Sequence, residues 1–174
     1  LPADAEVPSF VIPAKTKGPK EKNKSSTVHK EFKSLKDLKD HVKKPIYIID
    51  EGLQSVQFLG ANVISYFDNE VLDVSLGFID PMNAISMEEA NISLAAQYQY
   101  PDPYPLWAAA PTEGGNPGYS LEKVDFLPSP GIQITTLYGF VFCWIEKKVL
   151  YTLILENNPT SDQALSFVSS LKSL

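Results

Sequence analysis

The sequence predicts one α+β domain: a six- to eight-stranded, mainly antiparallel sheet with a helix near each end of the chain, both on one face of the sheet. Two stretches predict it. Residues 140–145 and 149–155 are apolar runs rich in β-branched and aromatic side chains, and the charged turn 146–148 between them indicates a hairpin. Residues 160–163 read as a capping box and open a helix expected over 161–173. Its apolar stripe has helical spacing: Ala164, Phe167, Val168, Leu171 and Leu174.

The composition fits one globular domain and argues against nucleic acid as a partner. The 174 residues are 44% hydrophobic, and no run approaches the roughly 18 apolar residues of a membrane span. Residues 1–44 hold 11 Lys against 6 acidic side chains, whereas residues 45–174 hold 4 Lys against 15. The 15 cations of the chain are all Lys, so guanidinium recognition of phosphate is excluded. An acidic body without arginine does not predict a nucleic-acid interface.

Residues 1–31 are expected to be a flexible or extended tether, and residues 32–174 the domain. The first segment is interrupted by prolines, and residues 14–26 are rich in Lys without apolar periodicity. The short apolar stretch 7–12 could lie against the domain as an edge strand or remain loose. The Lys run is read as a solvated linker or as a basic arm near an anionic envelope. Because the chain opens at Leu1 without Met, we expect membrane attachment only through a segment upstream of Leu1.

The remaining elements follow from caps, breakers and alternation. Ser34 is expected to cap a helix that Pro45 ends, with Leu38 and Val42 on its apolar face. From Ile46 onward apolar and polar residues alternate, which is typical of strands in hairpins. Strands are expected at residues 46–49, 54–59, 62–67, 71–79, 91–100, 119–126 and 132–137.

The segment 100–118 is the strongest signal for a binding surface. It holds five prolines, three glycines and several aromatic side chains, and it is far longer than an ordinary connection. Aromatic side chains on proline-rich loops are typical of contact surfaces. The alternative is that these side chains fold back and cap the sheet. The candidate partner or ligand contacts are Tyr98, Tyr100, Tyr104, Leu106 and Trp107.

The sequence carries no pattern that predicts catalysis, a metal or a cofactor, and we expect no enzyme. Cys143 is the single cysteine and lies inside an apolar run, so we expect a small buried side chain and not a nucleophile. With His29 and His41 as the only histidines, a multi-histidine metal site is not expected. Adjacent acidic pairs such as Asp50-Glu51 are typical of solvated turns. Phosphate-binding glycine loops are missing from the sequence as well.

Two stretches together resemble a family. The family's opening helix and first strand are similar to the stretch that begins with Phe32-Lys-Ser-Leu-Lys-Asp-Leu and runs to Pro45-Ile-Tyr-Ile-Ile. Its closing part is similar to Trp144-Ile-Glu146-Lys-Lys-Val-Leu-Tyr151, followed by a helix that ends at Ser169-Ser170-Leu171. The family is an uncharacterised extracytoplasmic domain of Gram-positive bacteria, found in anti-sigma-factor-like membrane proteins and in lipoproteins. The resemblance covers about residues 32–174 and implies a curved antiparallel sheet, shaped like lipoprotein carriers and sigma-regulator sensors, without catalytic residues. The family often carries a short sequence motif after its first strand, and residues 50–53 preserve only the glycine of that motif.

Two functions therefore remain open. The first is a non-catalytic extracytoplasmic sensor or interaction domain of a membrane-anchored protein, which would regulate signalling across the envelope through a protein partner or an envelope component. The second is a carrier-like binder of a lipid or other apolar ligand, which needs a cavity. The side chains expected to line that cavity are Phe58, Phe67, Phe78 and Phe142.

Overall fold

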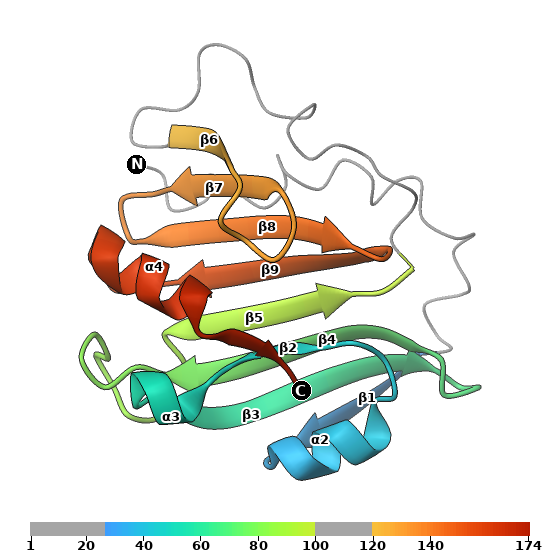
Figure 1. The fold of residues 1–174 in the computed structure, drawn as a ribbon. Helices are drawn as coiled ribbons and strands as arrows, with labels where there is room; N and C mark the ends of the chain where they lie inside the picture. Colours follow the sequence, from blue (N-terminus) through green and yellow to red (C-terminus); the bar gives the residue numbers. More distant parts are fainter. Residues whose placement is uncertain (1–26, 100–119) are drawn as a thin grey trace.

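The computed structural model describes residues 27–99 and 120–174, which build an open eight-stranded sheet, a two-stranded sheet and short helices (Figure 1). Neighbouring strands of both sheets are antiparallel. This confirms the α+β class. The strands of the large sheet, in spatial order, are β1 (Thr27–Phe32), β3 (Gln57–Tyr66), β4 (Val71–Ile79), β5 (Ile92–Gln97), β9 (Val149–Leu155), β8 (Phe140–Glu146), β7 (Gly131–Thr135) and β6 (Ser120–Val124).

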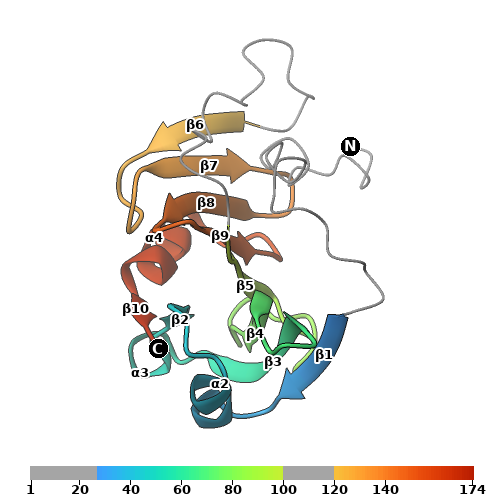
Figure 2. The same ribbon diagram turned by 90° about the vertical axis from the view of Figure 1, so that its right-hand side faces the viewer.

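The other elements are helices α2 (Leu35–His41), α3 (Glu51–Gln54) and α4 (Ser161–Ser169), and the small sheet of β2 (Tyr47–Ile49) with β10 (Leu171–Ser173). Figure 2 shows the large sheet curving, with α4 and the small sheet on one side of it. We call this side the inner face and the opposite side the outer face. Trp144 and Tyr151 belong to the inner face, and Cys143 and Leu150 to the outer face, because successive side chains of a strand point to opposite sides.

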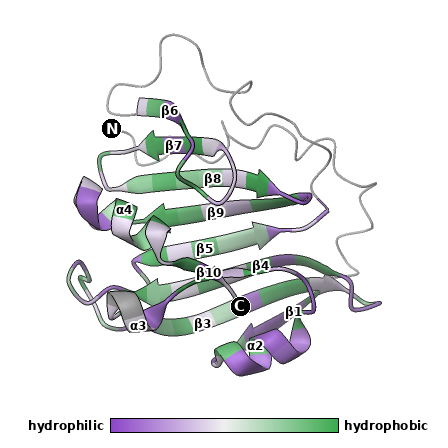
Figure 3. Cartoon of the chain, in the orientation of Figure 1, coloured by the Kyte–Doolittle hydropathy of each residue, from purple (hydrophilic) through white to green (hydrophobic). Residues whose placement is uncertain are grey.

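The core lies between the inner face and the elements that cover it. Leu38 of α2, the C-cap residue Val42, and Phe167 and Val168 of α4 belong to the same buried cluster as the inner-face side chains. In Figure 3 the central strands are largely hydrophobic, while the side of α2 that faces the viewer is hydrophilic. Burial of this apolar surface, at about 25 cal/mol per Å², is what orders the short helices, which are too short to be stable alone.

Aromatic rings fix the small sheet on the core. Trp144 and Tyr151 stack with ring centroids 5.3 Å apart, and Tyr47 of β2 meets both rings edge-on. The Tyr47 hydroxyl donates to Glu146 Oε2 at 2.7 Å. The carbonyl of Pro45 accepts from the hydroxyls of Tyr98 at 2.7 Å and Tyr151 at 3.4 Å. Pro45 is thereby tied to the sheet; the helix that it was expected to end stops earlier, at His41, with Val42 as its C-cap.

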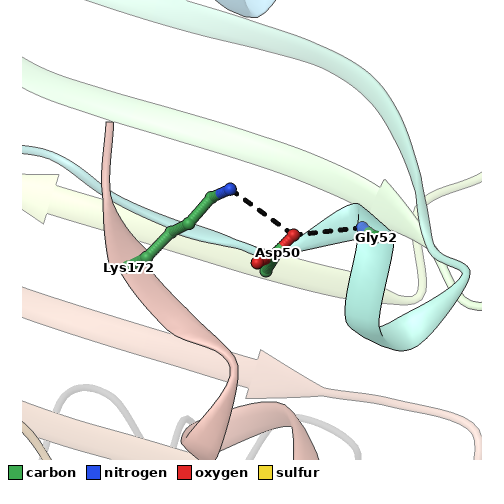
Figure 4. A network of polar contacts seen from close by, with 3 residues as sticks. All are labelled: Asp50, Gly52 and Lys172. Carbon is green, nitrogen blue, oxygen red and sulfur yellow. Dashed lines mark hydrogen bonds and ion pairs between the residues drawn. The ribbon is translucent and has the colours of Figure 1, made fainter.

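A polar contact joins the two strands of the small sheet at one end (Figure 4). Asp50 caps α3, and its Oδ1 accepts from the Gly52 N–H at 3.1 Å. The ammonium of Lys172, in β10, lies 3.4 Å from the same oxygen. This ion pair is solvent-accessible, so its contribution to stability is about 0–1 kcal/mol.

Three expected boundaries differ from the structure. Residues 27–31, assigned to the tether, pair with β3 as strand β1, so the sheet begins earlier than expected. The expected strands 54–59 and 62–67 are one strand, β3, because a register shift between Phe58 and Gly60 lets the ladder continue past the glycine. The last helix ends at Ser169 and not at residue 173, since the chain turns into β10.

Candidate interaction surfaces

Of the predicted contact residues, the structure describes only Tyr98, and it places this side chain in the core. Tyr98 is 5% exposed, and the ammonium of Lys44 lies 5.2 Å from the centroid of its ring. Together with its hydrogen bond to Pro45, this makes Tyr98 a residue that positions the chain between α2 and β2. It is therefore not a surface contact. The remaining predicted contacts lie outside the described residues: Tyr100, Tyr104, Leu106 and Trp107.

The described residues also show where the expected cavity-lining side chains lie. Phe78 and Phe142 are buried at 0% and 1% exposure. The rings of Phe58 and Phe78 are in edge contact at 5.6 Å, so these side chains pack against one another. Phe67, by contrast, is exposed in the connection between β3 and β4. Three of the four belong to the filled core, and the fourth faces solvent.

Burial shifts the pKa of several titratable groups of the described chain. Burial raises the pKa of the Cys143 thiol to about 12, although its Sγ donates to Thr152 Oγ1 at 3.9 Å, so the thiol stays protonated near neutral pH. Burial and the nearby Lys30 lower the pKa of His41. Within residues 27–99 and 120–174, no cluster of three or more His, Cys, Asp or Glu side chains could hold a metal ion.

The connection between β4 and β5 presents large apolar side chains to solvent. Met82 is 82% exposed, Ile85 87% and Met87 52%. The sequence is consistent with a loop at these residues but does not predict that their side chains are exposed. Only the structure shows that all three side chains turn away from the core.

The base of this loop is held by Asn91, which is 3% exposed. Its Oδ1 accepts from the Asp80 N–H at 2.7 Å, and its Nδ2 donates to the Asp80 carbonyl at 3.0 Å. The Asn91 N–H donates to the carbonyl of Phe78, and its carbonyl accepts from Glu156. Both the main chain and the side chain of Asn91 therefore close the loop onto the sheet.

Asp80 extends this network into the loop and to α4. Its Oδ1 accepts from the Met82 N–H at 3.1 Å, and its Oδ2 accepts from Asn83 Nδ2 at 2.8 Å. The same Asn83 nitrogen donates to Gln163 Oε1 at 3.2 Å. Gln163 is the second member of the capping box with Thr160. The loop is thus attached to the N-terminus of α4.

Further exposed apolar side chains lie at the same end of the sheet. Leu165 of α4 is exposed, and so are Leu137 and Tyr138 in the β7–β8 turn. Thr136 Oγ1 accepts from the N–H groups of Tyr138 and Gly139, and the Tyr138 carbonyl accepts from Asn158 ahead of α4. In Figure 1 the three segments lie at the left-hand ends of the strands. We call the following set the apolar end surface: Met82, Ile85, Met87, Leu137, Tyr138 and Leu165.

The segments that carry the apolar end surface contain only negative charges. Residues 80–91, 136–139 and 156–165 contain no lysine. Their exposed charged side chains are Glu88, Glu89, Glu156 and Asp162. Ile85 and Met87 therefore lie beside carboxylates.

A hollow lies on the outer face over β3, β4 and β5, with a volume of about 290 Å³. Its floor consists of small residues, among them Gly60, Ser75 and Gly77, and Glu31 and Lys33 also line it. A side chain at Gly77 would come within 3.1 Å of the Ala90 side chain, so the close packing there accounts for the glycine.

No protein-family model, no curated protein and no solved structure matches this chain. Among the described helices, none is both long enough and apolar enough to cross a membrane.

Proposed function

We propose that this chain is a non-catalytic interaction domain that binds a protein partner through the apolar end surface. The observation that carries the proposal is the β4–β5 loop. Its base is fixed by the buried Asn91 and by Asp80, yet Met82, Ile85 and Met87 face solvent. An apolar patch displayed from an anchored loop is typical of a protein-binding surface.

The chemistry of the surface indicates the kind of partner. Methionine side chains adapt to irregular apolar surfaces, and Met82 and Met87 are the only methionines of the chain. The acidic side chains around them favour a partner whose apolar contact is bordered by Lys or Arg. The association rate should consequently fall as the salt concentration rises.

We further propose that the domain works outside the cytoplasmic membrane, as the sensor or interaction part of a membrane-anchored protein that regulates signalling across the envelope. The Pro- and Lys-rich residues 1–26 and the family resemblance support this location. The partner is then a protein or another component of the envelope.

The carrier alternative receives less support. It needs a hollow between the sheet and the helices, whereas Phe78, Phe142 and Trp144 are fully buried there among other large side chains. Native mass spectrometry of the protein from its own host distinguishes the two functions. A bare mass agrees with the interaction domain, and a co-purifying lipid would favour the carrier.

Site-specific photocrosslinking tests the surface. A benzophenone amino acid placed at Ile85 should capture a protein of defined mass in the native host. The same group placed at Phe67 is the matched control, because Phe67 is 69% exposed but belongs to the opposite end of β4. Capture at position 85 alone is expected.

Substitution tests the same contact without a probe. Ile85→Ser combined with Met87→Ser should abolish capture by a crosslinker on another part of the surface, while the melting temperature stays within a few degrees. Equal capture at positions 85 and 67, or full binding by the double variant, would contradict the proposed surface.

A membrane-impermeant amine reagent tests the location, because the chain has 15 Lys. Intact host cells should label the protein, whereas labelling that requires cell lysis would place the domain in the cytoplasm. A cytoplasmic protein used as the control must remain unlabelled until lysis.

A further inference from the structure

Both methionines of the chain belong to the apolar end surface. Met82 is 82% exposed and Met87 is 52% exposed, and the sequence holds no third methionine. Neither residue is a member of the two buried clusters of the described chain, nor does either pack against them. Two of the three apolar side chains that the β4–β5 loop presents are therefore thioethers that face solvent.

The third sulfur atom of the chain is protected from oxidants. Cys143 is 1% exposed, and burial raises the pKa of its thiol to about 12. Because the thiolate is the form that attacks an oxidant, a buried thiol that stays protonated reacts slowly. A thioether has no proton to lose, so its sulfur lone pair is available at any pH. Mild oxidation is therefore directed to Met82 and Met87.

The β4–β5 loop is fixed by groups other than the methionine side chains. The side-chain amide of Asn91 closes the loop on the main chain of Asp80, whose carboxylate accepts from the Met82 N–H. The amide of Asn83 joins the loop to Gln163. A change at either sulfur leaves these hydrogen bonds in place. It therefore alters the polarity of the surface and not the fold.

We propose that Met82 and Met87 are sites of reversible oxidation that regulates the apolar end surface. The surface binds its partner when both side chains are thioethers and releases it when they are sulfoxides. This inference rests on the proposed function, because it concerns the same surface. A sulfoxide is polar, so burying it against an apolar partner costs free energy unless a donor meets its oxygen. After oxidation, Ile85 alone remains of the three apolar loop side chains.

The oxidant is a hydroperoxide, and the reaction is a two-electron oxygen transfer. A lone pair of the thioether sulfur attacks one peroxide oxygen, the O–O bond breaks and an S–O bond forms. The hydroxide that leaves takes up the proton of the transferred oxygen, so hydrogen peroxide is reduced to water while the sulfur is oxidised to a sulfoxide. Hydrogen peroxide is uncharged, so the exposed Glu88 and Glu89 next to Met87 do not repel it. Reductases specific for each sulfoxide epimer restore the thioether.

Mass spectrometry measures the site of oxidation in the folded, full-length chain. Dilute hydrogen peroxide should add two oxygen atoms, and peptide mapping should place them at Met82 and Met87. Cys143 should remain unmodified until the chain is unfolded in denaturant. The melting temperature of the oxidised protein should stay within a few degrees of that of the reduced protein. Oxidation of Cys143 as fast as that of the methionines, or methionines that react only after denaturation, would overturn the proposal.

The benzophenone group at Ile85 measures the consequence for binding. Protein is treated with hydrogen peroxide, freed of peroxide with catalase and mixed with an extract of the native host. It should capture the partner at least about fivefold less than untreated protein does, and treatment with both sulfoxide reductases should restore capture. The matched control is Met82→Leu/Met87→Leu, which keeps two apolar side chains of similar volume without a thioether. Its capture should be the same, within about twofold, before and after peroxide.

The outcomes separate failure of the regulation from failure of the proposed function. Equal capture by oxidised and reduced wild-type protein would overturn the regulation and leave the proposed surface standing. Loss of capture after peroxide in the Met82→Leu/Met87→Leu control would assign the effect to another oxidised group and would overturn the regulation as well. If untreated protein captured no partner at Ile85, the proposed function itself would fail, and the regulation with it.

Discussion

At the scale of single residues, Asn91 has the clearest structural role. Its four polar groups join the end of β4, the start of β5 and the chain ahead of α4. A side-chain amide suits this position, because it accepts from the Asp80 N–H and also donates to the Asp80 carbonyl, which the Asn83 N–H contacts as well. Asn91 therefore controls how the β4–β5 loop is held.

Replacement of Asn91 by Ala should lower the free energy of unfolding by about 1–3 kcal/mol, since the Asp80 N–H loses its acceptor and the Asp80 carbonyl loses one of its two donors. Urea denaturation measures the change. Asn62→Ala is the control, because Asn62 is exposed on β3, and its effect should be within about 0.5 kcal/mol. Equal effects of the two substitutions would disprove the role of Asn91.

Three tyrosines contribute a pH dependence to the stability of the fold. Burial, and then neighbouring negative charge, raises the pKa of Tyr98 and Tyr151 above the usual 10.0. Burial and the hydrogen bond to Glu146 raise the pKa of Tyr47 to about 12. Above pH 10 the unfolded chain loses these protons first and binds fewer protons than the folded chain. These groups therefore make their full contribution to the free energy of unfolding below about pH 10, and this contribution decreases as the pH rises further.

Tyr98→Phe should weaken this alkaline loss of stability. The wild-type free energy of unfolding, measured in urea between about pH 8 and 11, should fall more steeply above pH 10 than that of the variant. The variant also loses the hydrogen bond to Pro45, which lowers stability at every pH by about 1 kcal/mol. If the pH profiles of the wild-type protein and the variant were parallel, the pKa of Tyr98 would be the same in the folded and the unfolded chain.

At the scale of elements, α4 carries two surfaces with different roles. Phe167 is buried in the core at 4% exposure, whereas Leu165 belongs to the apolar end surface at 44% exposure. The helix ends at Ser169 because the Ser170 hydroxyl donates a hydrogen bond to the Phe167 carbonyl. The Asp50 N–H in turn donates to the Ser170 carbonyl. These contacts direct the chain into β10.

Phe167→Ala should cost about 3–5 kcal/mol of unfolding free energy, as expected for a large side chain removed from a packed core. Leu165→Ala, on the same helix, should change stability by no more than about 0.5 kcal/mol and should reduce partner capture instead. Chemical denaturation and the crosslinking assay separate these effects. A large stability loss at Leu165 would place this residue in the core.

At the scale of the whole molecule, the inner face depends on the last part of the chain. Truncation after Asn158 removes α4 and β10 and exposes the inner-face side chains of β8 and β9. The truncated protein should lose several kcal/mol of stability, at about 25 cal/mol per Å² of exposed apolar surface. Thr160→Ala removes only the helix cap and should cost about 1 kcal/mol. Calorimetry would contradict this architecture if the truncated chain melted within a few degrees of the intact one.

The sequence by itself determined the elements whose signals are local. The capping box at Thr160, the helix cap at Ser34 and the hairpin 140–155 could be predicted because caps, turns and alternation act over a few residues. The burial of Cys143 and the inner-face alternation of β5 were also predictable. These features depend on short-range sterics and on apolar periodicity.

Only the tertiary structure decided the rest. Leu171 has helical spacing with Phe167, yet it pairs with Ile49 in a strand, because β2 offers hydrogen bonds that a further helical turn would leave unmade. Tyr98 was predicted as a contact and is a core residue, since the carbonyl of Pro45, distant in sequence, accepts a hydrogen bond from its hydroxyl. The exposure of Met82, Ile85 and Met87 likewise follows from the Asn91–Asp80 contacts. Each outcome depends on partners far apart in the chain, which local patterns do not encode.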